Sequence, residues 1–96
     1  MSPINRKKLE ILRKELDKID NSLIKIIKRR TYLVKEVLKL KKFKNQIVDR
    51  RRINRILNRV KRKSIKEKID PKITNRIWKN MIWSYINYEK KVFKRK

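Results

Sequence analysis

The sequence predicts an all-α fold, with three helices per chain, one of them very long, and two chains joined as an intertwined antiparallel homodimer. Neither Pro nor Gly interrupts the chain between Pro3 and Lys42, so a first helix is expected over about residues 4–42. Apolar residues recur in steps of seven along this segment, and no segment has the pattern of a β-strand. Much later, Asp70-Pro71 forms a strong helix start, because the carboxylate can cap a helix whose first position suits proline.

The first predicted helix carries an apolar face with charges set into it. One column of this face is purely apolar and contains Leu12, Ile19, Ile26, Leu33 and Leu40. A second column places Arg30 among Leu9, Leu16, Leu23 and Val37. A third contains Arg13, Asp20, Ile27, Val34 and Lys41. A helix of about 40 residues is ~60 Å long, far more than a compact monomer with a radius of gyration of about 12–13 Å can cover. An antiparallel second copy would cover it, and would bring Arg13 of one chain towards residues in the 30s of the other.

Two shorter helices are expected after a break near residues 44–46. Asp49 is a candidate N-cap for the second, predicted over about residues 50–63, with apolar positions Ile53, Ile56, Leu57 and Val60. The third is predicted over about residues 71–93. One of its stripes contains Ile73, Ile77, Met81, Ser84 and Tyr88, and a flanking stripe contains Trp78, Ile82, Tyr85 and Glu89. The three helices are expected to form a single domain over residues 1–96.

The composition excludes several classes of chemistry. Without Cys or His, the chain cannot form disulfides, thiolate or imidazole metal sites, or Ser-His and Cys-His nucleophile systems, and no metal is expected. Without Gly, it also lacks phosphate-cradling loops. The first residues contain no apolar signal segment and no stretch approaches the ~20 apolar residues of a membrane span, so a cytoplasmic protein with no membrane partner is expected.

The net charge of +24, from 33 basic and 9 acidic residues, makes nucleic-acid binding a serious alternative. However, Gly and Ala are absent while Lys, Ile and Asn abound, as expected of an AT-rich genome. Part of the charge is therefore attributed to mutational drift, and nucleic acid is expected only as a non-specific partner.

Arg30, which lies within an apolar column of the first predicted helix, is the strongest candidate for a ligand-binding residue. Desolvating the Arg30 guanidinium costs several kcal/mol unless an anion meets it. The ordinary interpretation is an arginine that reaches solvent at the edge of the seam or pairs with Asp20 or Glu36. Arg13 and Lys41 are, singly, ordinary solvated charges. Antiparallel pairing would nevertheless gather cations of both chains at one end of the dimer, where a dianionic ligand could be clamped.

Two positions would flank that end. Asp49 and Arg52 lie at the start of the second helix, although the run of arginines there is also typical of a solvated helix start. Glu89 closes an apolar stripe of the third helix. Such a residue is more often a salt-bridged helix-end carboxylate, but beside a dry pocket its pKa would be raised and it could donate a proton.

Taken in order, these positions form one series along the chain. It runs through Leu12-Arg13, Asp20, Ile26-Ile27-Lys28-Arg29-Arg30, Val34, Glu36-Val37, Lys41, Val48-Asp49-Arg50-Arg51-Arg52 and the third helix with Glu89. In order and spacing the series resembles the all-α AroQ class of chorismate mutases, the type II family, over roughly residues 9–93. The resemblance implies an isomerase that rearranges chorismate to prephenate in phenylalanine and tyrosine biosynthesis, a pericyclic step that needs no cofactor.

The resemblance also implies roles for the cations. Arg30, with Arg13 from the partner chain, would hold the two carboxylates of the substrate. Lys41 would reach the ether oxygen and a carboxylate, and Arg52 would support that end of the site.

The remaining site residues follow from the same resemblance. Glu89 falls where the family has a Gln or Glu that hydrogen-bonds the ether oxygen, so Lys41 and Glu89 are the expected catalytic residues. Asp49 would lie near the ring hydroxyl and Tyr85 would contact the substrate. The apolar wall would consist of Val37, Ile53, Ile82 and Ile86.

Two departures from the family pattern concern the far side of this pocket. Ile53 replaces the usual Glu that contacts the ring hydroxyl, and Tyr85 replaces a small hydroxyl residue, with Ser84 one place early. The contact with the ring hydroxyl is therefore lost or taken over by another group.

Three alternatives to a chorismate mutase stay open: an isochorismate-pyruvate lyase on the same fold, a basic helical nucleic-acid-binding protein, and a purely structural helical dimer.

Overall fold

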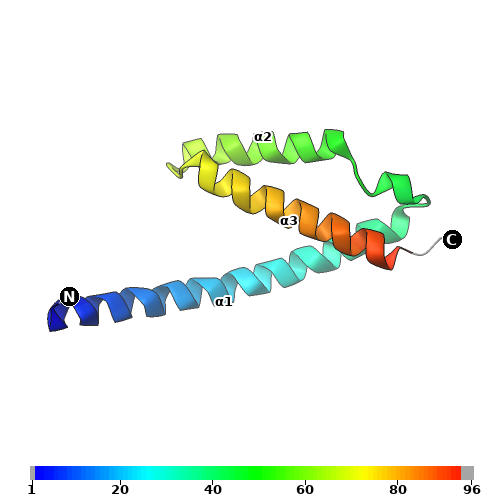
Figure 1. Ribbon diagram of the computed structural model, residues 1–96. Helices are drawn as coiled ribbons and strands as arrows, with labels where there is room; N and C mark the ends of the chain where they lie inside the picture. The colour runs from blue at the N-terminus through cyan, green and yellow to red at the C-terminus, as the bar shows by residue number, and fades with distance from the viewer. Residues whose placement is uncertain (1, 94–96) are drawn as a thin grey trace. The chain divides into compact units, whose positions relative to one another are not determined.

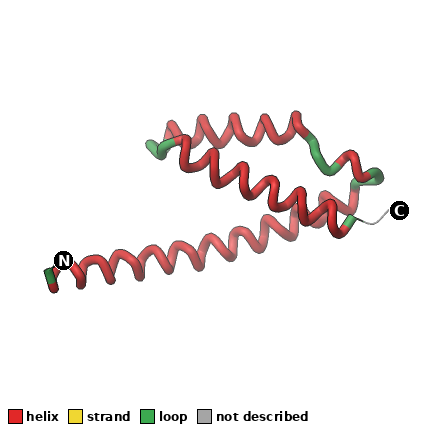
Figure 2. The backbone as a smooth tube through the Cα atoms, in the orientation of Figure 1, coloured by secondary structure: helices red, strands yellow, loops and turns green. Residues whose placement is uncertain are grey.

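The computed structural model describes residues 2–93, which form three α-helices and one short 3-10 turn (Figure 1). In chain order these are α1 (Pro3–Leu40), η1 (Lys44–Gln46), α2 (Arg50–Lys66) and α3 (Pro71–Val92). Short loops connect them, and no strand occurs within residues 2–93 (Figure 2). The predicted all-α class, with one very long helix, is confirmed. The helix ends differ slightly from expectation, because α1 stops at Leu40 and α2 continues beyond residue 63 to Lys66.

The chain divides into two units, and the border lies within α1, between Val34 and Lys35. The described part of the first unit is a single helix. It begins at a capped end, where the Ser2 hydroxyl accepts a hydrogen bond from the backbone N–H of Asn5 at 3.2 Å. No residue of α1 is buried. Its large apolar side chains are largely exposed, as for Leu12 and Ile26, each at 62%.

The second unit contains a hairpin of α2 and α3, which pack together near the turn that joins them and diverge away from it (Figure 1). Its buried core consists of Ile47, Ile56, Val60, Ile82 and Ile86, and half-buried side chains pack against it: Leu38, Val48, Ile53, Leu57, Trp78 and Phe93. The apolar positions expected on the second helix and on one stripe of the third therefore meet each other. The other α3 stripe remains open in the single chain, with Ile73 56% and Ile77 52% exposed.

Both predicted N-caps are present in this unit. The Asp49 carboxylate accepts from the backbone N–H of Arg52 at 3.0 Å, and the Asp70 carboxylate accepts from that of Lys72 at 2.9 Å. Pro71 occupies the first turn of α3, as its sequence position indicates.

The C-terminus of α2 ends in a motif that normally contains glycine. The backbone N–H of Ile69 donates to the Ser64 carbonyl and that of Lys68 donates to the Ile65 carbonyl, which together form a Schellman motif. Lys68 takes the left-handed position of this motif with φ 59°. A residue with a Cβ is disfavoured there by about 1–2 kcal/mol, so the chain holds local strain at the turn into α3.

A polar link joins the two helices near this turn. The buried Ser64 hydroxyl lies 2.6 Å from the Thr74 hydroxyl and 2.6 Å from the Val60 carbonyl. Both hydroxyls are thus satisfied, and the link fixes the start of α3 against the end of α2.

Within the described residues, no helix is both long enough and apolar enough to cross a membrane.

Candidate active site

The last turns of α1 lie beside the C-terminal part of α3 within the second unit. The Lys35 ammonium lies 5.7 Å from the centroid of the Tyr88 ring, within the range of a cation–π interaction. One residue after α1 ends, Lys41 is half-buried, and its ammonium lies 3.5 Å from the Ile47 carbonyl, to which it donates. The end of α1 therefore carries Lys41 towards the core rather than into solvent.

Glu89 is buried on α3, with only 5% of its surface exposed. It follows Ile82 and Ile86 on one stripe of the helix, and all three residues are buried. A carboxylate in such surroundings loses hydration, and this desolvation raises the pKa of Glu89. The Lys41 ammonium opposes the shift by favouring the carboxylate, but its effect on the pKa is the smaller of the two.

These observations bring two predicted catalytic residues into one electrostatic environment. The charge of the Lys41 ammonium favours the ionised form of Glu89, the residue that follows Ile82 and Ile86 on the buried stripe of α3. An ammonium donates hydrogen bonds, and a carboxyl group donates while it is protonated, the form that the raised pKa of Glu89 favours. Such a site can stabilise negative charge that develops on a ligand oxygen.

Asp49 and Arg52 lie at the first turn of α2. One carboxylate oxygen of Asp49 caps the helix by accepting from the Arg52 backbone N–H, and both side chains are exposed. A hollow of about 620 Å³ adjoins this turn and is lined by Gln46, Val48, Asp49 and Arg50. Asp49 therefore has a structural role as a cap, whereas its contact with a ring hydroxyl remains a prediction.

The other predicted contact residues of the second unit differ in exposure. Tyr85 and Ile53 are half-buried, and Ile53 packs against the hydrophobic core. Val37 is 51% exposed and thus open on the surface of the single chain. Ser84 is exposed, and its hydroxyl donates to the Asn80 carbonyl of its own helix at 2.7 Å. Of the two neighbours, Tyr85 therefore lies nearer the apolar interior.

The two predicted carboxylate-binding arginines lie on α1 in the first unit. Arg13 is exposed and Arg30 is half-buried. Arg30 follows Leu9, Leu16 and Leu23 in its column, as the heptad pattern indicates. The role of Arg13 was predicted for a second copy of the chain, so it remains a prediction.

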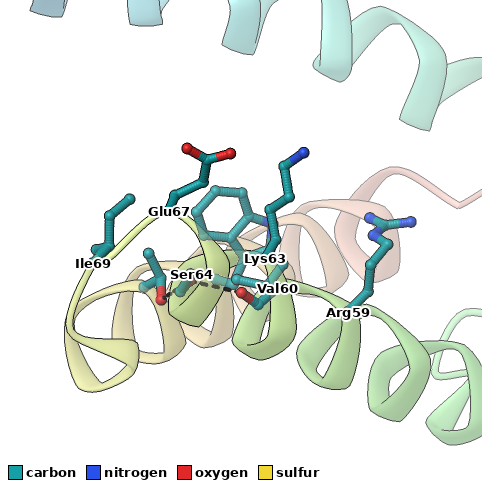
Figure 3. A pocket seen from close by; sticks show the side chains of 8 residues that line it. Arg59, Val60, Lys63, Ser64, Glu67 and Ile69 are labelled. Carbon is teal, nitrogen blue, oxygen red and sulfur yellow. Dashed lines mark hydrogen bonds between the residues drawn. The ribbon is translucent and has the colours of Figure 1, made fainter.

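A hollow of about 440 Å³ between α2 and α3 was not anticipated from the sequence (Figure 3). It is lined by Arg59, Val60, Lys63, Ser64, Glu67, Ile69, Thr74 and Trp78. None of the predicted site residues is among them. Figure 3 shows the charged ends of Arg59, Lys63 and Glu67 extending away from the α2 backbone. In the sequence, the position of Trp78 on an apolar stripe was the only sign of this hollow. The Ser64–Thr74 hydrogen bond could not be expected from the sequence, because it depends on how α2 and α3 meet.

Within residues 2–93, no cluster of three or more potential ligand side chains is arranged to hold a metal ion.

Comparison with protein-family models matches residues 12–90 to chorismate mutase type II. The matched segment contains all the predicted site residues, from Arg13 to Glu89, and makes up most of the chain. No curated protein and no solved structure matches the chain. The chain belongs to the chorismate mutase type II family, the AroQ class.

Proposed function

We propose that the protein converts chorismate to prephenate as a step in phenylalanine and tyrosine biosynthesis. Membership of the family supports chorismate mutase activity in general. The observation that carries the proposal is the buried Glu89, whose pKa is raised by desolvation and which interacts with Lys41 at the end of an apolar stripe. This arrangement suits a reaction that needs hydrogen-bond donors in a dry site.

The rearrangement is a single pericyclic step in which a C–O bond breaks while a C–C bond forms. It needs neither a nucleophile nor a proton relay, so a chain without His or Cys can catalyse it. Catalysis then comes from holding the flexible enolpyruvyl ether in its compact reactive conformer and from stabilising charge on the ether oxygen. We assign the two donors at that oxygen to the Lys41 ammonium and the protonated Glu89 carboxyl group.

The proposed substrate contacts complete this assignment. Arg30, together with Arg13 of the partner subunit, would bind the two carboxylates as bidentate ion pairs. Arg52 would support the Lys41 end, and Asp49 would use its remaining carboxylate oxygen near the ring hydroxyl. Tyr85 would contact the substrate from α3, with apolar wall supplied by Val37, Ile53, Ile82 and Ile86.

A homodimer is part of the proposal, because α1 exposes an apolar seam that nothing in its own unit covers. Leu16, Ile19 and Leu33 are 57%, 56% and 53% exposed. Burying one such side chain contributes about 1.5–3 kcal/mol, and isolated helices depend on packing for most of their stability. A second antiparallel copy would cover the seam and would supply Arg13 to the site.

The proposal is tested by incubating the pure protein with chorismate and, separately, with isochorismate, and by identifying the products. Conversion of chorismate to prephenate supports the proposed reaction. Release of pyruvate from isochorismate with no prephenate formed from chorismate would instead identify a lyase on the same fold. No reaction with either substrate would refute the catalytic proposal.

A matched pair of variants then tests the assignment of the donor. Lys41→Met should lower kcat by about 100- to 1,000-fold, the usual effect of removing one preorganised donor at a developing oxyanion. Lys42→Met removes the same charge from the next residue, which is exposed, and should leave kcat near that of the unmodified protein. Equal losses in the two variants would contradict the assignment.

A further inference from the structure

α2 carries a concentration of positive charge, of which the proposed reaction uses Arg52 alone. Nine of its 17 residues are Arg or Lys and none is acidic. It contains six of the chain's twelve arginines, and all nine of its cationic side chains are exposed. Arginine is the basic side chain best suited to bind phosphate, because its planar guanidinium donates two parallel hydrogen bonds.

Four of these cations form one stripe, which we call the cationic face of α2: Arg51, Arg55, Arg62 and Lys66. The buried α2 residues Ile56, Val60 and Ser64 lie on the opposite side of the helix. Asn58, a neutral hydrogen-bond donor, falls in the middle of the stripe. From Arg51 to Lys66 the stripe extends over about 22 Å at 1.5 Å per residue.

The charge pattern of α2 opposes helix formation. Like charges four residues apart, as in Arg51 and Arg55 or Arg62 and Lys66, destabilise a helix by about 0.2–0.5 kcal/mol per pair. Arg50 and its two successors also place positive charge at the positive end of the helix dipole, and the first turn contains no acidic residue.

The N-cap carboxylate of Asp49 offsets part of this repulsion at the start of α2, but no ion pair within residues 2–93 offsets it along the stripe. On α1, Lys18 pairs with Glu15 at 3.3 Å and Lys39 pairs with Glu36 at 3.0 Å. Among residues 2–93, no ion pair involves a cation of α2. A polyanion bound from outside would therefore relieve a repulsion that the fold leaves in place.

The geometry of the face selects among polyanions. A helix is about 10–12 Å across with its side chains, and the major groove of B-form DNA is about 12 Å wide. The major groove of duplex RNA is too narrow to admit side chains. α2 contains no aromatic residue on which the bases of a single strand could stack.

Two other partners fit less well. A helix that binds a membrane inserts its apolar face, but Ile56 and Val60 of α2 are buried in the hydrophobic core. A second copy of the chain would present the same cations and be repelled. We propose that the cationic face of α2 docks on the phosphates that border the major groove of duplex DNA, without preference for base sequence.

This surface is separate from the proposed active site, because it contains none of the residues assigned to substrate binding or catalysis. The inference rests on charge and packing rather than on the proposed function. If the protein binds DNA through α2 but lacks chorismate mutase activity, only the proposed function is refuted. If it has chorismate mutase activity but does not bind DNA through α2, only the present inference is refuted.

The test measures binding of a labelled 20-base-pair DNA duplex by fluorescence anisotropy over a series of salt concentrations. Four phosphate contacts predict a slope of about −3.6 for log K against log salt. The triple variant Arg55→Gln, Arg62→Gln, Lys66→Gln should make the slope less steep by about 2.7 and weaken binding about 100- to 1,000-fold at 0.1 M salt. Circular dichroism would verify that the variant remains helical.

The matched control carries Lys7→Gln, Lys8→Gln and Lys14→Gln, which remove the same charge from exposed positions of α1. It should retain the slope of the unmodified protein. A loss as large as that of the α2 variant would mean that net charge, not α2, governs binding, and would overturn the inference. Tighter binding of duplex RNA, single-stranded DNA or anionic vesicles than of duplex DNA would overturn it as well.

Discussion

Glu89→Gln should convert an enzyme whose rate depends on pH into one whose rate is nearly constant over the same range. Burial raises the pKa of Glu89, and the Lys41 ammonium offsets only part of this effect. Below that pKa the carboxyl group is neutral and can donate to the ether oxygen. Above it the neutral fraction, and with it kcat, should fall about tenfold per pH unit. The fall should level off at about 100- to 1,000-fold, the contribution of one donor.

The assay is the initial rate of chorismate loss at saturating substrate from about pH 4 to pH 9. The Gln amide donates at every pH, so the profile of the variant should be flat. Glu10→Gln, at an exposed position of α1, is the control and should retain the pH dependence of the unmodified protein. A flat profile for the unmodified protein would refute the assignment of Glu89 as a proton-bearing donor.

The same shift has a consequence for stability, with a definite sign. Because the pKa of Glu89 is higher in the folded state than its ordinary value of 4.5, protonation favours the fold. This contribution is fully present below about pH 4.5 and is lost as the pH rises through the folded-state pKa. Glu89→Gln should therefore raise the free energy of unfolding at neutral pH relative to the unmodified protein, and an unchanged value would contradict the effect of burial.

Three further predictions follow from the fold and the charge. Lys68→Gly should stabilise the chain by about 1 kcal/mol in urea unfolding, because glycine adopts the left-handed conformation without strain, and destabilisation would contradict the Schellman assignment. Leu23→Asp places an unpaired charge in the apolar seam of α1 and should dissociate the proposed dimer in sedimentation experiments. Lys25→Asp, at an exposed position, should leave the dimer intact. A monomeric unmodified protein would rule the dimer out. Added salt should lower kcat/KM, since the charge of +24 steers a dianionic substrate, and a rate at low substrate independent of salt would exclude steering.

The sequence was sufficient to predict most of the fold because its signals are local. The uninterrupted heptads predicted α1, and Asp49 and Asp70 marked the starts of α2 and α3. The end of α2 was placed too early because the rule for helix ends relies on glycine, which this chain lacks. Lys68 takes the left-handed position that glycine usually occupies, and this is evident only from its positive φ angle of 59°.

The candidate site was less accessible to sequence reasoning because it depends on tertiary packing. The position of Glu89 on an apolar stripe suggested a raised pKa, but its burial depends on how α3 packs in the second unit. Asp49 was predicted both as a cap and as a substrate contact, and the fold establishes the cap. The hollow beside Trp78 could not be predicted, because it is lined by residues of both α2 and α3. Its shape depends on how the two helices meet, as does the hydrogen bond between Ser64 and Thr74.

The most direct test of the central claim is the kcat/KM for chorismate of the pure protein beside two arginine variants. Arg30→Ala should lower kcat/KM by at least about 100-fold, or ~3 kcal/mol, because a substrate carboxylate loses its charged partner. Arg29→Ala removes the same charge from the preceding, exposed residue of α1 and should leave kcat/KM within a few-fold of the unmodified protein. Near-normal turnover by Arg30→Ala would contradict the account of the site.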